Sequence, residues 1–269
     1  EQSIMQVNRY TNLVLTIIAG CGLGACFVVS SGAQESSSPH APLMETLGDY
    51  HRPVSTSAPL AQRFFDQGLR LIFGYYFPEA VVSFREAVRH DANFAMAYWG
   101  MALAIGPNPN SRYFSAEDDP KGEGRKAIEI AVSLGHGASE RERAYIEALA
   151  IRFSDREESD REYAEAMRRL LERYPSDPDA GMLYADALMT MSPWTYWGAD
   201  GKPYFSGTLE AATALEHVIE KLPQHPGANH LYIHLMENSQ TPERALPHAD
   251  RLAQLMPGLG HVVHMPGHI

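Results

Sequence analysis

The amino-acid sequence predicts an all-α protein, an α-solenoid of paired helices with two loop insertions. From residue 59 onward, apolar residues recur at intervals of three and four, which is the period of an amphipathic helix. The helical stretches are short and end at Pro, Gly, Asp or Ser. A unit of about 34 residues repeats along the chain, which is a length typical of helix-pair repeats. No stretch alternates polar and apolar residues convincingly, so we expect no strands.

The predicted helices follow one another with short connections. They cover residues 61–74, 78–90, 94–105, 124–134, 139–153, 160–174, 180–191, 208–222, 227–239 and 242–256. Ser139 and Glu142 have the spacing of a capping box at a helix start. Two insertions, residues 106–124 and 192–207, lie between helices. We expect the second insertion, which is aromatic, to fold against its own domain; a lid over a binding groove is the alternative.

The repeat is clearest in residues 61–94. Gly68, Ala80, Phe84 and Ala87 occupy the positions at which a tetratricopeptide repeat (TPR) has a small, a small, an aromatic and a small side chain. Small residues let the two helices of a unit approach closely, and the aromatic residue fills the gap beneath the next unit. We therefore expect each helix pair to be a TPR-like unit.

Composition and motifs restrict the classes of function. With 45% hydrophobic and 20% charged residues the chain can bury a real core. The net charge of −11 and the lack of a Lys/Arg run argue against nucleic acid as a partner. No Gly-x-Ser-x-Gly or Gly-x-x-x-x-Gly-Lys motif is present. Because no catalytic set is complete, we expect a binding protein rather than an enzyme.

Residues 1–33 have the organisation of a signal peptide. Met5 is the expected start, Arg9 supplies the positive charge, and an apolar stretch over residues 13–29 is followed by small residues. Cys21, after Ile-Ala-Gly, also fits a lipoprotein signal with a lipid anchor, and a retained membrane anchor is a third interpretation. All three place the folded part outside the cytoplasm of a bacterium, in the periplasm, at the outer membrane or secreted.

Two further segments complete the predicted organisation. Residues 34–58 are rich in Ser, Pro and His, and we expect them to form an extended leader. Residues 59–269 form the predicted helical repeat domain. Its pattern is still incomplete at Ile269, so we expect further repeats to follow.

Several stretches resemble a group of large exported bacterial TPR proteins. They are FDQGLR (65–70), AYWG followed by GPN (97–100 and 106–108), HPGANH (225–230) and HVVHMPGH (261–268). The likeness covers roughly residues 45–269, and its histidine-rich part is the most specific. It implies a right-handed solenoid whose first helix in each pair faces a concave groove. It also implies export from the cytoplasm, but no defined activity. The repeat register and the lack of a complete catalytic set favour a protein or peptide partner held in this groove.

Histidines gather at the end of the chain. Of the twelve in the sequence, the following lie after residue 224: His225, His230, His234, His248, His261, His264 and His268. His230 and His234 recur as His264 and His268 about one repeat length later. Residues four apart lie on one face of a helix, with Cβ atoms about 5–6 Å apart, so two imidazoles there can hold one metal ion. The family resemblance implies that these positions, with Glu237 and His261, face the groove.

Three interpretations of this cluster remain open. The first is a metal site, with these predicted ligands: His230, His234, Glu237, His264 and His268. Imidazole and carboxylate ligands suit Zn, Cu, Fe or Ni. The second is a polar groove for a peptide or another organic ligand, formed by His230, His234, Glu237, His261, Asn229 and Trp197. The third is a set of structural histidines. A metal-dependent hydrolase or a metal-handling protein is the alternative to a binding scaffold.

One residue limits the symmetry of the predicted metal site. Pro266 is unfavourable inside a helix and fits the first helical position instead. We therefore expect His264 to lie before a helix rather than within it. The equivalence of His264 with His230 would then be only nominal.

Overall fold

The computed structural model describes residues 40–110 and 122–269. The predicted signal peptide, including Cys21, lies outside the described residues, as do part of the leader and most of the first insertion. The chain divides into two units, residues 1–38 and residues 39–269, and all the described residues belong to the second. In the described ranges, no helix is both long and apolar enough to cross a membrane.

The described part of the chain is helical, apart from one isolated bridge between Trp197 and Pro203. Its α-helices are α1 (Pro59–Phe73), α2 (Phe77–His90), α3 (Ala95–Ile105), α4 (Glu123–Ser133), α5 (Glu140–Arg152), α6 (Ser159–Arg173), α7 (Pro178–Thr190), α8 (Gly207–Lys221), α9 (Pro226–Met236), α10 (Leu246–Leu255) and α11 (Gly260–His264). Each predicted helical stretch overlaps one of the helices from α1 to α10, and α11 was not predicted. The capping box at Ser139 and Glu142 is also confirmed at the start of α5.

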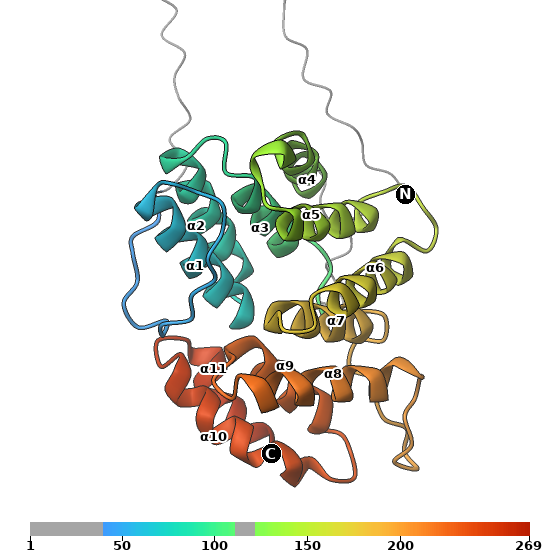
Figure 1. Cartoon of the computed structure of the whole chain (residues 1–269). Helices are drawn as coiled ribbons and strands as arrows, with labels where there is room; N and C mark the ends of the chain where they lie inside the picture. Colours follow the sequence, from blue (N-terminus) through green and yellow to red (C-terminus); the bar gives the residue numbers. More distant parts are fainter. Residues whose placement is uncertain (1–39, 111–121) are drawn as a thin grey trace, which may run out of the picture. The chain divides into compact units, whose positions relative to one another are not determined.

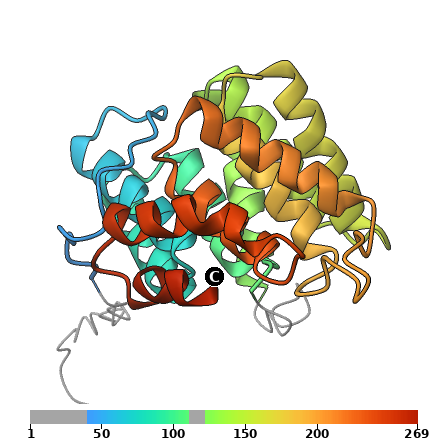
Figure 2. The ribbon, with the colours of Figure 1, turned by 90° about the horizontal axis from the view of Figure 1, so that it is seen from below.

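The helices are arranged as an α-solenoid, which confirms the predicted fold class (Figure 1). Each helix from α1 to α10 packs against the next in sequence, and α1 packs on α3, α3 on α5 and α7 on α9. Packing between neighbours and between alternate helices is what a stack of helix pairs produces. Figure 2 shows α10 and α11 side by side at the C-terminal end, in agreement with their contact.

The small residues of the repeat lie where helices approach most closely. A Cβ added to Gly68 in α1 would lie 2.6 Å from the Phe84 ring, and one added to Gly100 in α3 would lie 2.4 Å from it. Phe84, in α2, is fully buried between these two helices. The aromatic position of the repeat therefore fills the gap between successive first helices, as the sequence predicts.

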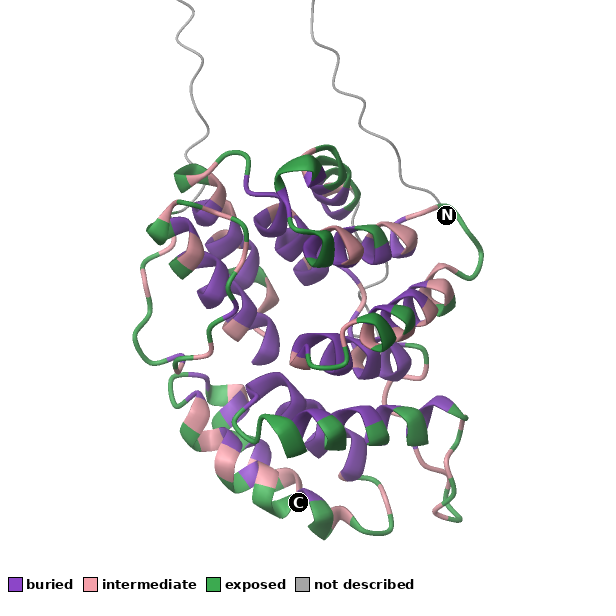
Figure 3. Cartoon of the chain, viewed as in Figure 1, coloured by how far each residue is buried: buried purple, intermediate pink, exposed green. Residues whose placement is uncertain are grey.

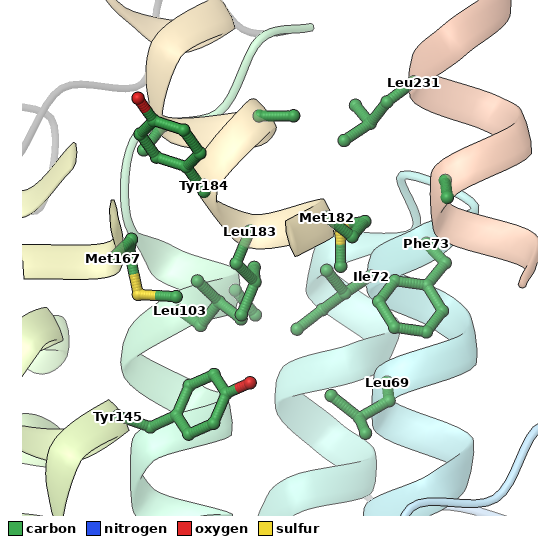
Figure 4. Packing of buried hydrophobic residues seen from close by; sticks show 14 of the residues in the cluster. Leu69, Ile72, Phe73, Leu103, Tyr145, Met167, Met182, Leu183, Tyr184 and Leu231 are labelled. Atoms are coloured by element: carbon green, nitrogen blue, oxygen red, sulfur yellow. The ribbon is translucent and has the colours of Figure 1, made fainter. Parts of the chain in front are cut away.

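The inner helices meet around a shared apolar centre instead of enclosing an open groove. Ile72 of α1, Leu103 of α3, Leu183 of α7 and Leu231 of α9 point toward one another (Figure 4). The cavity between these helices has a volume of about 20 Å³, enough for about one water molecule. In addition, α1 contacts α9 directly. The expected concave groove is thus filled here, because large apolar side chains occupy the inner faces.

The described part of the leader, residues 40–58, is non-helical and packs along several helices. Arg52 is buried and forms ion pairs with Asp177, the N-cap of α7, and with Asp179. Its guanidinium also lies 4.6 Å from the centre of the Tyr145 ring in α5, a cation–π contact. The leader therefore connects elements that are far apart in sequence.

Candidate metal centre

Helix α9 carries two of the histidines and is held in place at its start by a third. His225 is the N-cap: its Nδ1 accepts a hydrogen bond from the Ala228 amide at 3.1 Å. Its Nε2 therefore carries the proton and donates to Asp179 of α7, also at 3.1 Å. Every residue of α9 is buried (Figure 3). His230 and His234 consequently lie in the interior, at 0% and 3% exposure.

The hydrogen bonds of His230 define which of its nitrogens can bind a ligand. Its Nδ1 lies 2.5 Å from the carbonyl oxygen of Phe73. A carbonyl only accepts, so Nδ1 carries the proton and Nε2 presents a lone pair. That Nε2 lies 3.0 Å from Nε2 of His261. Burial, together with the neighbouring imidazoles, holds the pKa of His230 well below its ordinary value, so this ring is neutral at pH 7.

His234, like His230, carries its proton on Nδ1, but the hydrogen-bond partner of that nitrogen is different. Its Nδ1 lies 3.3 Å from a carboxylate oxygen of Glu237, which can only accept a hydrogen bond from it. Its Nε2 is buried and has no hydrogen-bond partner among residues 40–110 and 122–269. A carboxylate that orients one nitrogen while the other stays free is the usual arrangement behind a metal-binding histidine.

Three imidazole nitrogens converge at this point. His230 and His234 of α9 and His261 of α11 each offer a ligand atom, and these atoms lie within 4.8 Å of one another. Zn–N bonds of 2.0–2.1 Å in a tetrahedron separate two nitrogens by about 3.3 Å. The 3.0 Å between the Nε2 atoms of His230 and His261 is close to that separation. Burial and the adjacent histidines lower the pKa of His261 to about 4, which keeps this ring neutral as well.

Two aromatic side chains enclose the three histidines. The Tyr75 ring lies 4.4 Å from the His230 ring and stacks on His234 at 5.6 Å. Trp194, from the second insertion, places its ring edge-on to His234 at 5.4 Å. Both residues have positive φ angles, 62° and 63°, which are unfavourable for bulky side chains. The second insertion thus folds against its own domain and covers part of the cluster.

Glu237, His264 and His268 lie on the other side of His234. One oxygen of Glu237 accepts from His234, and the other accepts from Nδ1 of His268. Nε2 of His268 in turn lies 3.0 Å from Nε2 of His264. Burial would raise the pKa of Glu237, but its bonds to His234 and His268 lower it overall, so the carboxylate is ionised. Glu237 therefore connects two groups of imidazoles.

The structure also separates the predicted ligand list into two groups. His230 and His234 come together with His261. His261 was expected to face the groove but is not among the predicted metal ligands. His264 is the last residue of α11 and also the N-cap of the following 3₁₀ helix, Met265–His268, which has Pro266 in its first turn. His264 therefore precedes the helix that contains Pro266, as expected, but it also ends a helical turn, α11, that was not predicted from the sequence.

Two residues of the predicted organic-ligand site have other partners. The Asn229 amide donates to the carbonyls of Pro223 and His225, and its oxygen accepts from Arg251. The Trp197 ring nitrogen donates to the Leu235 carbonyl at 2.6 Å. Both side chains hold segments of the fold together, and neither belongs to the histidine cluster.

Comparison with known proteins provides no family assignment. No family model matches the chain, and no curated protein matches it. Among solved structures the chain is similar to YrrB, described as a TPR protein with an unusual peptide-binding site. The identity is 16%, the match covers 76% of this chain and 90% of that one, and the TM-score is 0.36. A likeness this distant carries no functional argument, and the solenoid assignment rests on the helix contacts.

Proposed function

We propose that this helical-repeat protein binds a divalent transition-metal ion through Nε2 of His230, His234 and His261. The observation that carries the proposal is the free Nε2 of His234, which is buried while Glu237 orients the opposite nitrogen. Leaving a buried polar atom without a partner costs about 1–3 kcal/mol. A metal ion bound between the three rings would satisfy this lone pair.

The ligand set indicates the class of ion. Neutral imidazoles suit Zn²⁺, Cu²⁺, Ni²⁺ and Fe²⁺, whereas Ca²⁺ and Mg²⁺ require oxygen ligands. Three protein ligands leave a fourth tetrahedral position for water or another ligand. The low pKa values of His230 and His261 support the proposal, because a proton then competes weakly with the metal for each ring.

Metal titration tests this proposal. The chain stripped of metal with a chelator should bind Zn²⁺ at about one equivalent with high affinity, measured by calorimetry and by metal analysis after dialysis. His234→Ala and His261→Ala should each weaken binding at least about 100-fold, by analogy with the loss of a metal-orienting contact. His136→Ala removes an exposed histidine outside the cluster and should change nothing. High-affinity binding that survives both cluster variants would refute the assignment.

A specific cavity favours metal-assisted hydrolysis as the second candidate. The water-sized cavity beside His230 is also lined by Tyr75 and Asp186. Burial raises the pKa of Asp186 to about 6, the range in which a carboxylate acts as a general base near neutral pH. A metal ion held by the three histidines would lower the pKa of a water molecule in its fourth position and so activate it for attack. This role is supported if the zinc-loaded wild type hydrolyses model esters and Asp186→Asn does not, although the variant still binds zinc. The role is excluded if the zinc-loaded wild type is inactive toward esters, amides and phosphoesters.

A scaffold role is proposed alongside metal binding. A cleft of about 760 Å³ lies along α6, lined by residues that include Arg161, Arg168, Tyr184 and Glu210. Its mixture of both charges and apolar side chains suits a peptide or protein partner. Screening a peptide library against the wild type and Tyr184→Ala tests this, since peptides that bind the cleft should lose affinity in the variant. Equal binding to both proteins would exclude the cleft.

We also propose that the protein works outside the cytoplasm of a bacterium, which rests on the signal-like residues 1–33. Fractionation of cells that express the full gene tests this location. Globomycin, which blocks lipoprotein processing, distinguishes the lipid anchor at Cys21 from simple cleavage. Recovery of the protein in the cytoplasmic fraction would contradict the proposal.

A further inference from the structure

His264 and His268 form a second pair of facing imidazoles beside the three-histidine site. The two residues lie four apart in sequence, and their Nε2 atoms are 3.0 Å apart. This is the same separation as between His230 and His261. Nothing in the proposed three-histidine site uses these two nitrogens.

The opposite nitrogens of this pair are already hydrogen-bonded. Nδ1 of His268 lies against a carboxylate oxygen of Glu237, and Nδ1 of His264 lies 3.4 Å from the carbonyl oxygen of Gly260. Both partners only accept, so both Nδ1 atoms carry protons and both Nε2 atoms present lone pairs. Two lone pairs that face each other at this distance repel unless a cation lies between them. That cation is either a proton or a metal ion.

Glu237 links this pair to the buried site. One of its carboxylate oxygens orients His234 and the other orients His268. Its negative charge offsets part of the charge of a cation on either side. The rings also form a continuous series, since the His264 ring lies 4.9 Å from the His261 ring and the His268 ring 5.6 Å from the His234 ring.

Exposure distinguishes the two groups. His230 and His234 are buried, His261 is half-buried, the side chain of His268 is 26% exposed, and His264 is exposed. An ion from solution therefore reaches His264 and His268 before it reaches the buried nitrogens of His230 and His234. Two protein ligands also hold an ion more weakly than three, which favours transfer inward.

We infer that His264 and His268 form a second, weaker transition-metal site that loads the buried three-histidine site. This inference rests on the proposed metal function and adds an outer position and a direction of transfer. Glu237 serves as the positioning residue for both sites, because it fixes one ring of each.

A Co²⁺ titration of the metal-free chain tests the outer site. The visible absorption of Co²⁺ distinguishes a tetrahedral site, which absorbs strongly, from a water-rich octahedral one, which absorbs weakly. We expect a tight equivalent with strong absorption and a second equivalent, at least about 10-fold weaker, with weak absorption. His264→Ala and the double variant with His268→Ala should lose only the second equivalent. His248→Ala, which changes a half-buried histidine outside the cluster, is the matched control.

The rate of loading tests the transfer. With Co²⁺ below the dissociation constant of the outer site, the strong absorption should develop about 10-fold more slowly in His264→Ala than in the wild type and His248→Ala. His264 is exposed, so this substitution should leave the fold intact, as circular dichroism would confirm.

Each outcome separates the two proposals. One tight equivalent in the wild type, with unchanged loading in His264→Ala, overturns the outer site and leaves the buried site supported; the pair then shares a proton. A second equivalent that persists in the double variant also overturns it. No Co²⁺ or Zn²⁺ binding by the wild type overturns the buried site and the outer site together.

Discussion

Replacing Arg52 with alanine tests how the leader is held to the helices. The Arg52 guanidinium is 6% exposed and bonds to Asp177 at 3.0 and 3.2 Å and also to Asp179. Both carboxylates are at least as buried. Removing one partner of a buried ion pair leaves uncompensated charge and costs about 3–5 kcal/mol. We expect Arg52→Ala to lower the free energy of unfolding by about that amount at pH 7.

This loss should shrink as the pH falls. Burial opposes ionisation of Asp179, but the charge of Arg52 and the bonds from His225 and Tyr50 hold its pKa below the ordinary value. A lowered folded-state pKa stabilises the protein above the unfolded pKa of about 3.9, and that contribution is lost as the pH falls further. Without Arg52, burial instead raises the pKa of Asp179, so protonation relieves the variant. The difference between the two unfolding free energies should therefore become smaller as the pH falls from 7 to 3.

Urea unfolding followed by circular dichroism at several pH values measures both effects. The matched control is Arg85→Ala, because Arg85 pairs with Glu123 on the surface, where the side chains are 40% and 42% exposed. Exposed pairs contribute about 0–1 kcal/mol. If Arg52→Ala unfolds at the same urea concentration as Arg85→Ala at pH 7, the leader is not held by this buried network.

Three further predictions follow from packing and charge. Gly100→Ala should lower the free energy of unfolding in urea by about 1–3 kcal/mol, because its Cβ would meet the Phe84 ring. Gly137→Ala is the control and should stay near the wild type, since nothing lies within 4 Å of its Cβ. Equal effects of the two substitutions would contradict the repeat packing. Trp194→Ala should speed the release of Zn²⁺ to a chelator without changing the number of ions bound, because the Trp194 ring covers one edge of the cluster. An unchanged release rate would show that this ring is no barrier. The metal-free protein should lose stability as the pH falls from about 6.5 toward 4. The reason is that the folded state lowers the pKa of His261, so the unfolded chain takes up a proton on this ring more readily. An unfolding free energy that stays constant over that range would show that the fold does not hold His261 in its neutral form.

The helices and their pairing could be predicted because their causes are local. Apolar spacing marked the helices from α1 to α10, and the capping box at Ser139 and Glu142 marked the start of α5. Gly68, Phe84 and their repeat spacing indicated where helices approach, since close packing requires a small side chain opposite a large one. These features depend on contacts within one repeat unit or between adjacent units. They can therefore be predicted from residues that are close together in the sequence.

The histidine cluster was predicted only in part, because its geometry depends on segments distant in sequence. The spacing of His230 and His234 placed two imidazoles on one face of α9. The third partner, His261, arrives from α11, and Tyr75 arrives from the connection after α1. No periodicity in the sequence specifies that α1 contacts α9, and this contact is what places the Phe73 carbonyl against His230.

The sequence by itself determined the fold class, the positions of the helices from α1 to α10 and the concentration of histidines near residue 269. Only the tertiary structure decided that the inner face is filled, that Arg52 is buried, and that the imidazoles form an inner three and an outer two around Glu237. The physical reason is that periodicity fixes the direction of a side chain relative to its own helix. Which partner it meets, and whether water remains between them, depends on the curvature summed over the whole stack.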